Sequence, residues 1–144
     1  MSRIEIKLPE KFIFSMDIPV RISDTNRGGH IAFNQVLSFA EEARVPFLES
    51  IGYPEQNVSG IAYIFADVGV IYKKQGFYKQ TLRVEVGIGD LSEKGCDLIF
   101  KISNSETGEE MYRVKIGMLF FDYRQQKVIA VPDEFKRKVA ARVS

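Results

Sequence analysis

The sequence has few of the residues that build disulfide frameworks and zinc sites. Its 144 residues include one cysteine, Cys96, and one histidine, His30. A single cysteine excludes both a disulfide within the chain and a CxxC metal motif. One cysteine with one histidine also argues against a dedicated zinc site. We therefore expect neither a metal nor a disulfide.

Long apolar runs and an excess of one charge are also missing. No stretch approaches the ~20 apolar residues that a membrane helix requires, and the charged N-terminus has no apolar signal region. The 20 basic residues nearly balance the 19 acidic ones, so the net charge of +1 creates no basic field for nucleic acid or membrane. We expect a cytoplasmic protein without nucleic-acid or membrane partners, folded as a single domain over residues 1–144.

Alternating apolar residues predict that most of the chain forms a β-sheet. The expected strands are residues 12–22, 61–74, 80–88, 96–102 and 111–122. Pro19 has no N–H group and therefore places the first strand at an edge of the sheet. The second strand is apolar on both faces, so we expect it to be covered on both sides, with Asp67 half-buried.

One long helical pattern covers residues 33–51. Its apolar residues form a broad arc at helical spacing, and the helix would be about 28 Å long. Pro46 is expected to kink or break it, and Asn34 to cap its start. Arg44 falls within the apolar arc, which is unusual for a core-facing position. Because only this helix has a wide apolar face, we predict an α+β domain whose sheet curls around it.

A polar cluster stands directly before this helix and includes Asp24, Asn26, Gly29 and His30. The first turn of a helix presents unpaired N–H groups and a partial positive charge, which can stabilise an oxyanion. Asn26 or Asp24 can orient a water molecule, and His30 can bind or shuttle a proton. The alternative is a structural loop whose Asp, Asn and Gly form turns and whose histidine is hydrogen-bonded structurally. Spacing does not decide between the two.

Other motifs of catalysis are weak or missing. Gly87-Ile-Gly89 lacks the later glycine and the following helix of a phosphate loop, and the chain has no G-x-S-x-G elbow. Cys96 lies on the apolar face of a predicted strand, which favours an inert core thiol over a nucleophile.

Residues 20–53 resemble the signature of the hotdog-fold acyl-CoA thioesterases, in the 4-hydroxybenzoyl-CoA thioesterase-like group. The pattern of that group is D-x-D-x-x-G-H-[VI]-N-N, followed by a helix of the form Y-L-x-Y-F-E-E-A-R. The matching residues here are Asp24-Thr-Asn26-Arg-Gly-Gly29-His30-Ile31-Ala32-Phe33 and then Phe39-Ala-Glu41-Glu42-Ala43-Arg44. Further along the chain, the resemblance includes Val70-Ile-Tyr72, Phe120-Phe-Asp122 and Val131-Pro132-Asp133.

The resemblance implies a hotdog fold, with a five-stranded antiparallel sheet curled around one long central helix. It also implies homodimers or homotetramers with active sites at the dimer interface. Arg44 would then reach a partner subunit or an internal carboxylate such as Asp67. The substrate would be an acyl-CoA thioester, so coenzyme A is part of the substrate and no cofactor is expected.

The chain departs from the group at the position of its catalytic aspartate, where it has Asn26. Asparagine cannot act as a carboxylate nucleophile or general base, although it can hold a water molecule or the thioester carbonyl. A subgroup with D-x-N-x-G-G-H exists, so Asn26 need not inactivate the site. Glu41, on the flank of the helix, and Asp24 are the candidate replacement carboxylates. Glu42, opposite the apolar arc, is expected to face solvent.

The predicted function is hydrolysis of an acyl-CoA thioester by water. The predicted catalytic residues are Asn26, His30, Asp24 and Glu41, with backbone N–H groups around Gly29 and the helix start holding the oxyanion. The predicted substrate-binding residues are Gly29, Asn34, Lys73 and Lys74, although the lysines and Lys79 also fit a plain solvent-facing role. Two alternatives stay open. The first, suggested by Asn26, is a module that binds acyl-CoA or acyl-carrier thioesters without cleaving them, and the second is a hotdog dehydratase.

Overall fold

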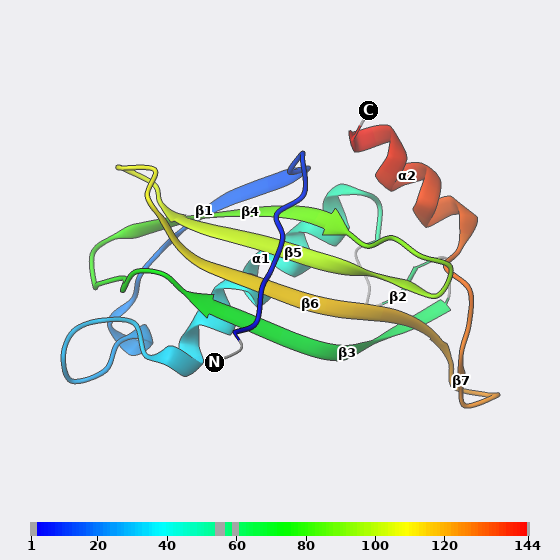
Figure 1. The fold of residues 1–144 in the computed structure, drawn as a ribbon, viewed down its shortest axis with the longest axis horizontal. Coiled ribbons are helices and arrows are strands. Elements are labelled where there is room, and N and C mark those ends of the chain that lie inside the picture. The colour runs from blue at the N-terminus through cyan, green and yellow to red at the C-terminus, as the bar shows by residue number, and fades with distance from the viewer. Residues whose placement is uncertain (1–2, 54–56, 59–60, 144) are drawn as a thin grey trace.

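A long helix lies against the concave face of a curled antiparallel sheet in the computed structural model, which describes residues 3–53, 57–58 and 61–143 (Figure 1). The strands are β1 (Phe14–Pro19), β2 (Asn57–Val58), β3 (Ile61–Tyr72), β4 (Thr81–Gly89), β5 (Gly95–Asn104), β6 (Glu110–Asp122) and β7 (Lys127–Val128). The helices are α1 (Val36–Ser50) and α2 (Asp133–Val143), with 3₁₀ turns at Ile22–Asp24 and Phe33–Gln35.

The strands follow the order β1-β4-β5-β6-β3-β2, and β7 pairs with β6. Every pairing is antiparallel, and the five long strands are β1, β3, β4, β5 and β6. The arrangement confirms the predicted hotdog architecture. Pro19 is placed as predicted, because β1 forms one edge of the sheet.

The core lies between α1 and the middle of the sheet. Alternate residues of the central strands are fully buried, because successive side chains of a strand point to opposite faces. These residues are Leu82, Val84, Val86, Leu98, Phe100, Ile102, Val114 and Ile116, and they pack with Phe39, Ala40, Ala43 and Phe47 of α1. Burying one large apolar side chain contributes about 1.5–3 kcal/mol. This packing fixes the start of α1, beside which the polar loop lies.

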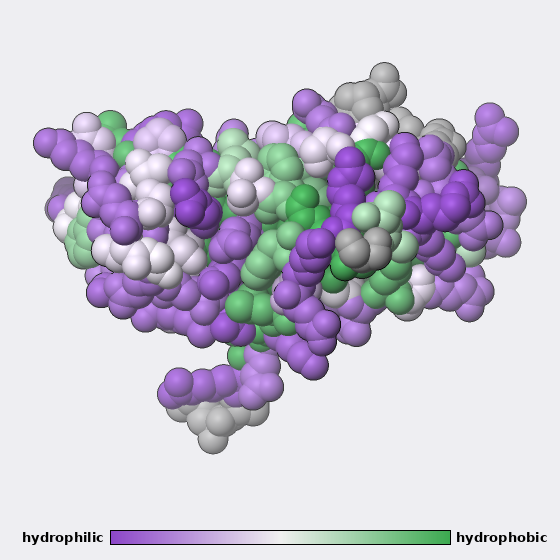
Figure 2. Space-filling model, turned by 90° about the horizontal axis from the view of Figure 1, so that it is seen from above, coloured by the Kyte–Doolittle hydropathy of each residue, from purple (hydrophilic) through white to green (hydrophobic). Residues whose placement is uncertain are grey.

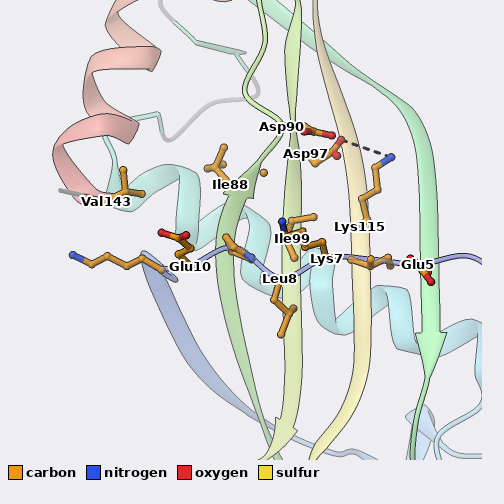
Figure 3. A pocket seen from close by; sticks show the side chains of 14 residues that line it. Glu5, Lys7, Leu8, Glu10, Ile88, Asp90, Asp97, Ile99, Lys115 and Val143 are labelled. Carbon is orange, nitrogen blue, oxygen red and sulfur yellow. Dashed lines mark ion pairs between the residues drawn. The ribbon is translucent and has the colours of Figure 1, made fainter.

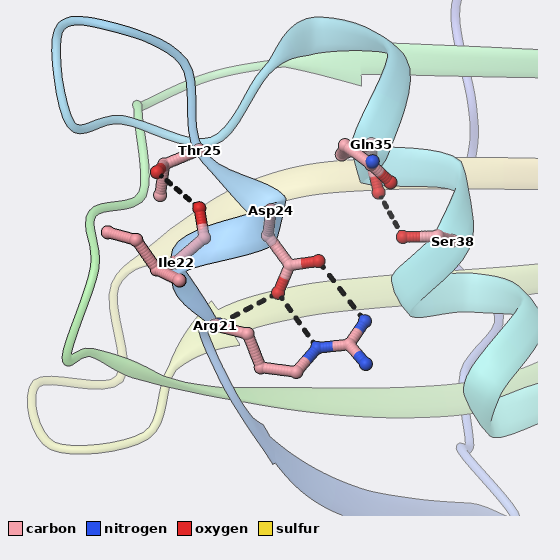
Figure 4. A network of polar contacts seen from close by, with 6 residues as sticks. All are labelled: Arg21, Ile22, Asp24, Thr25, Gln35 and Ser38. Carbon is pink, nitrogen blue, oxygen red and sulfur yellow. Dashed lines mark hydrogen bonds and ion pairs between the residues drawn. The ribbon is translucent and has the colours of Figure 1, made fainter.

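The start of α1 differs from the prediction. Asn34 lies inside the 3₁₀ turn and is not a cap; Ala32 and Gln35 occupy the cap positions, and neither makes a side-chain cap hydrogen bond. The Ser38 hydroxyl donates to the Gln35 carbonyl at 2.6 Å (Figure 4). The helix continues through Pro46. The carbonyl that loses its donor there belongs to Glu42, which is exposed, so water can hydrate it.

The prediction that β3 is covered on both sides is wrong for its middle. Residues 65–68 are exposed, and a bulge between Phe65 and Asp67 shifts the register against β6. Asp67 is not half-buried: its side chain is 62% exposed and pairs with Lys115 at 3.1 Å. The alternation of apolar residues could not show that this strand lies near an edge of the sheet.

The segment before β1 crosses the outer face of the sheet (Figure 1). Ile6 is buried there, and its carbonyl accepts a hydrogen bond from Arg113 Nη1 at 2.8 Å. A Cβ at Gly87 would lie 2.5 Å from the Pro9 side chain and 3.2 Å from the Lys11 carbonyl oxygen of this segment. Glycine therefore lets the segment lie close to the sheet.

Seen from the side of β1 and β4, apolar surface gathers in a band across the middle of the molecule, between hydrophilic ends (Figure 2). Phe14, Met16 and Ile18 of the edge strand β1 are only partly buried. Within the part of the chain that the structure describes, no helix is long and apolar enough to cross a membrane.

Candidate functional site

Asp24 fixes the first turn of the polar loop. Its carboxylate accepts hydrogen bonds from the Arg21 backbone N–H at 2.8 Å and from Arg21 Nε and Nη2 at 3.3 and 3.2 Å (Figure 4). Asp24 is only 2% exposed, and Thr25 Oγ1 closes the same turn by donating to the Ile22 carbonyl at 2.7 Å. The carboxylate that was predicted as a possible base is thus engaged in holding the loop.

The next residues form a tight reverse turn that brings His30 back beside Asn26. Thr25 pairs with Ile31, the Asn26 N–H donates to the His30 carbonyl at 2.9 Å, and the Gly29 N–H donates to the Asn26 carbonyl at 3.0 Å. Gly29 has a φ of 80°, in the left-handed region that favours glycine. Because its N–H closes the turn, Gly29 does not offer that group to a substrate.

A chain of buried hydrogen bonds anchors this turn to the sheet. The Ile31 N–H donates to the Gly76 carbonyl at 2.8 Å, and the Gly76 N–H donates to Tyr112 Oη at 2.7 Å. A Cβ at Gly76 would lie 2.6 Å from the Ile31 side chain, so a larger residue here would have to displace the buried Ile31 methyl group. Burial raises the pKa of Tyr112, although the Gly76 N–H works against that shift. The phenol therefore stays neutral over the ordinary pH range.

Asn26 and His30 contact each other through their side chains. Asn26 Nδ2 lies 3.2 Å from His30 Nδ1, and Asn26 Oδ1 accepts the Gly28 N–H at 2.9 Å. The edge of Phe77 packs against the imidazole, with 6.2 Å between ring centroids and an interplanar angle of 89°. The ring is therefore held on two sides.

A cavity of about 440 Å³ opens beside His30. It is lined by Asn26, His30, Ile31, Phe33, Tyr72, Lys73, Lys74, Gln75 and Tyr112. The structure thus brings Asn26 and His30 together with the two lysines that follow β3. Four other predicted site residues, Asp24, Gly29, Asn34 and Glu41, do not line it.

Tyr72, Gln75 and Tyr112 line the cavity, although none was singled out as a site residue. Tyr72 Oη donates to the Phe33 carbonyl at 2.8 Å, and the rings of Tyr72 and Tyr112 meet edge to face. Tyr72 appeared in the family resemblance, so a signal existed for it. Tyr112 occupies an ordinary inward position of its strand, and no local pattern distinguishes it.

The helix start reaches this cavity at Phe33. The N–H groups of Phe33 and Asn34 begin the 3₁₀ turn and have no partner within it. Phe33 is 75% exposed and lines the cavity. Of the residues at the helix start, Phe33 therefore borders the cavity, while Asn34 does not line it.

Glu41 forms an ion pair on the flank of α1. Its two carboxylate oxygens accept from Arg44 Nε and Nη2 at 2.9 and 3.0 Å. The Arg44 guanidinium also lies 4.9 Å from the centre of the Phe65 ring, and its Nη1 is 3.4 Å from Tyr63 Oη. Although burial works in the other direction, the hydrogen bonds with Glu41 raise the pKa of Arg44. Asp67 is thus not the partner of Arg44, because Glu41 is.

The two lysines of the cavity are already paired. Lys73 Nζ lies 3.2 Å from Glu110 Oε1, and Lys74 Nζ lies 2.7 Å from Glu109 Oε1. Burial alone would raise the pKa of Glu110, but hydrogen bonds from Arg113 and Lys73 lower it. An anionic ligand would have to compete with these carboxylates for the lysines.

A larger cavity, of about 720 Å³, lies elsewhere, between the N-terminal segment and the outer face of the sheet (Figure 3). It is lined by both signs of charge, with Asp97 and Lys115 paired at 3.7 Å. Burial raises the pKa of Asp97, while Lys115 opposes the shift. None of the motif residues reaches this cavity. Among residues 3–53, 57–58 and 61–143, no group of three or more His, Cys, Asp and Glu is arranged to hold a metal ion.

Comparison with known proteins identifies the family to which this chain belongs. A model of the thioesterase-like superfamily matches residues 20–139. The acyl-CoA thioesterase YbgC of Haemophilus influenzae is 22% identical over 126 residues, which are 85% of this chain and 91% of that protein. Similar solved structures include Slr0204, a 1,4-dihydroxy-2-naphthoyl-CoA thioesterase from Synechocystis, with a TM-score of 0.80 and 20% identity over 88% of this chain and 95% of that one. The 12:0-ACP thioesterase from Umbellularia californica has a TM-score of 0.79 and 17% identity, covering 89% of this chain and 52% of that one.

Proposed function

The chain belongs to the thioesterase-like superfamily, and from this membership we propose that it hydrolyses acyl-CoA thioesters in the cavity beside His30. The observation that carries the proposal is the meeting of Asn26, His30, Lys73 and Lys74 around one cavity at the start of α1. Similarity to a curated acyl-CoA thioesterase supports coenzyme A as the thiol portion. The protein is thus proposed to be an enzyme whose substrate contains coenzyme A and which uses no separate cofactor. Its location in the cytoplasm stays a prediction.

The groups around the cavity suit polarisation of a thioester carbonyl. The N–H group of Phe33 would hold the carbonyl oxygen as negative charge develops there, which lowers the barrier to attack by water. Tyr72 and Tyr112 would flank the acyl portion. Lys73 and Lys74 would meet the phosphates of coenzyme A by exchanging their present partners, Glu110 and Glu109.

We further propose that two copies of the chain pair along β3. Among the described residues, only the first two residues of β3 pair with β2, so the edge from Tyr63 onward has no strand beside it. Phe65, Val68 and Tyr72 expose large apolar side chains along this strand, at 41, 49 and 49%. Open edges and exposed apolar surface favour association. The molar mass from light scattering would distinguish a dimer from a tetramer made of two such dimers.

The pairing would also supply what the cavity lacks. No carboxylate lines it among the described residues, and Glu41, beside Phe65 through Arg44, lies close to the open edge. Glu41 of the partner subunit is therefore the proposed base. Mixing His30→Ala chains with Glu41→Gln chains would restore turnover only if each site draws residues from two subunits. Glu42→Gln serves as the matched control, because Glu42 is exposed and should be dispensable.

The first experiment is release of free thiol from aromatic, medium-chain and long-chain acyl-CoAs and from acyl-carrier-protein thioesters. We expect turnover on at least one of these, lost in His30→Ala and unchanged in Lys94→Ala, an exposed control. Lys73→Ala and Lys74→Ala should raise KM for acyl-CoA more than they lower kcat. A monomeric mass in light scattering with full activity would refute the pairing.

The second candidate function is a module that binds such thioesters without cleaving them. Asn26 favours it, because an amide cannot replace the carboxylate that the family usually has there, and no other carboxylate among the described residues lines the cavity. Tight acyl-CoA binding without thiol release from any substrate would establish this function in place of hydrolysis. Hydration or formation of a double bond in the acyl chain would instead identify a dehydratase.

A further inference from the structure

The hydrogen bonds of Asn26 determine which of its side-chain atoms faces His30. The Gly28 N–H is a donor and lies 2.9 Å from one amide atom, which must therefore be the oxygen. The amide nitrogen is then the atom that faces His30 Nδ1, at 3.2 Å. This assignment rests on the local network and needs no hydrogen to be seen.

The orientation of the amide determines the form of the histidine ring. An amide nitrogen only donates, so His30 Nδ1 must accept and carry no hydrogen. In the neutral ring the hydrogen is consequently on Nε2, the other nitrogen. Asn26 thereby selects one of the two tautomers.

His30 lines the cavity, and the residue beside its Nε2 edge is Gly28, which carries no side chain. A Cβ at Gly28 would lie 3.1 Å from both Nε2 and Cδ2, so only glycine leaves this edge uncrowded. Phe77 packs against the ring by its edge. Lys73 and Lys74 line the cavity with His30, and no carboxylate does so among the described residues. Nothing in the cavity of one chain competes for the Nε2 hydrogen as a charged acceptor.

We infer that His30 is a hydrogen-bond donor to the thioester carbonyl oxygen, and that Asn26 is the positioning residue that holds it in this form. The inference rests on the proposed function. As water adds, the carbonyl electron pair moves to the oxygen, which Nε2–H and the N–H group of Phe33 stabilise. The C–S bond then breaks, the proton from water ends on the coenzyme A thiol, and the Nε2 hydrogen stays in place. A proton shuttle would need a lone pair on Nε2, which the tautomer excludes.

The tautomer can be measured directly, because the chain has one histidine and thus one set of imidazole nitrogen signals. Nitrogen-15 NMR of histidine-labelled protein, at a pH where the ring is neutral, should show Nε2 carrying the hydrogen and Nδ1 bare. In Asn26→Asp a carboxylate would face Nδ1 and accept from it, so the hydrogen should move to Nδ1. In Asn26→Ala both tautomers should appear together. A wild-type signal from Nδ1–H would overturn the inference, whatever the enzyme does with thioesters.

Activity provides a second, separate test. Loss of one oxyanion donor lowers kcat by about 10²–10³, so we expect this loss for His30→Ala with a nearly unchanged KM. Glutamine also places an N–H donor near the position of Nε2 but cannot accept a proton as imidazole does. His30→Gln should therefore recover activity to within about tenfold of wild type. A His30→Gln enzyme that is folded and as inactive as His30→Ala would overturn the donor role. If wild type itself releases no thiol, the proposed function fails, while the NMR result still decides the tautomer.

Discussion

Replacing Tyr112 by phenylalanine should weaken the fold and the candidate site together. The change removes one buried oxygen, which accepts the Gly76 N–H at 2.7 Å, and leaves the ring in place. Tyr112 is 2% exposed, so water cannot easily replace the lost acceptor. Leaving a buried N–H unsatisfied costs about 1–3 kcal/mol. The Gly76 carbonyl also holds Ile31, so the turn that carries His30 should loosen with it.

Tyr72→Phe is the matched control. This variant also removes one phenolic hydroxyl from a residue that lines the cavity. The Tyr72 hydroxyl donates a hydrogen bond to the Phe33 carbonyl at 2.8 Å. Tyr72 is 49% exposed, however, so water can satisfy the carbonyl in its place. We expect a loss below about 1 kcal/mol for this variant.

Urea unfolding distinguishes the two variants. With an m value of about 2 kcal/mol/M, Tyr112→Phe should lower the midpoint by about 0.5–1.5 M, and Tyr72→Phe by less than about 0.5 M. The His30 imidazole signals should broaden or shift only in Tyr112→Phe. Equal midpoints for the two variants would refute the view that the buried chain from Tyr112 to Ile31 anchors the turn.

Three further predictions concern the core, acid stability and α1. Burial raises the pKa of Cys96 to about 12, so a thiol reagent should modify it at least about 10³-fold more slowly in native protein than in urea; fast native labelling would contradict this. Burial would raise the pKa of Glu110, but hydrogen bonds from Arg113 lower it. Ionised Glu110 therefore stabilises the fold at pH values above the ordinary carboxyl pKa, and this contribution is lost as the pH falls through the lowered pKa of Glu110 in the folded protein. Urea midpoints of Glu110→Gln should accordingly fall less between about pH 7 and pH 3 than those of wild type. Glu41→Gln should lower the free energy of unfolding, measured in urea, by about 0.5–1.5 kcal/mol, and Glu42→Gln should lower it less. The effect arises because the buried Arg44 loses its charged partner, and it stays modest because solvent already screens the exposed Glu41.

The strands and the long helix could be predicted because their signals are local. Alternation over β4, β5 and β6 and helical spacing over α1 are properties of neighbouring residues, and both patterns predicted these elements nearly to their ends. Whether a face of a strand is buried depends on distant parts of the chain and is not a local property. The middle of β3 is apolar on both faces yet exposed in one chain, because it lies near an edge of the sheet and carries a bulge at Phe65.

The site could be predicted in part, from the polar cluster before the helix and from the basic residues at the end of the second predicted strand. Asn26, His30, Lys73 and Lys74 do line one cavity, but their catalytic and binding roles stay predictions. Tyr112 was missed because its partner, Gly76, is 36 residues away and its position in the strand is that of a core residue.

The partner of Arg44 was predicted only in part. The hypothesis allowed a partner subunit or an internal carboxylate such as Asp67, and the structure shows an internal carboxylate, but it is Glu41, three residues before Arg44. The apolar stem and the guanidinium face of arginine can cover an aromatic ring such as Phe65 while the fork pairs with a carboxylate.

The cavity beside His30 is rich in donors, and this limits what one chain can do with a thioester. Nε2–H of His30, the N–H group of Phe33 and the ammonium groups of Lys73 and Lys74 are all donors that can stabilise negative charge, but none of these groups takes a proton from water. Because no carboxylate among the described residues lines the cavity, we expect the proton acceptor to be solvent hydroxide or a group of a second subunit. If it is hydroxide, kcat should rise in proportion to hydroxide concentration across the neutral range. If it is Glu41 of the partner subunit, kcat should level off once that carboxylate is ionised, and Glu41→Gln should remove the plateau.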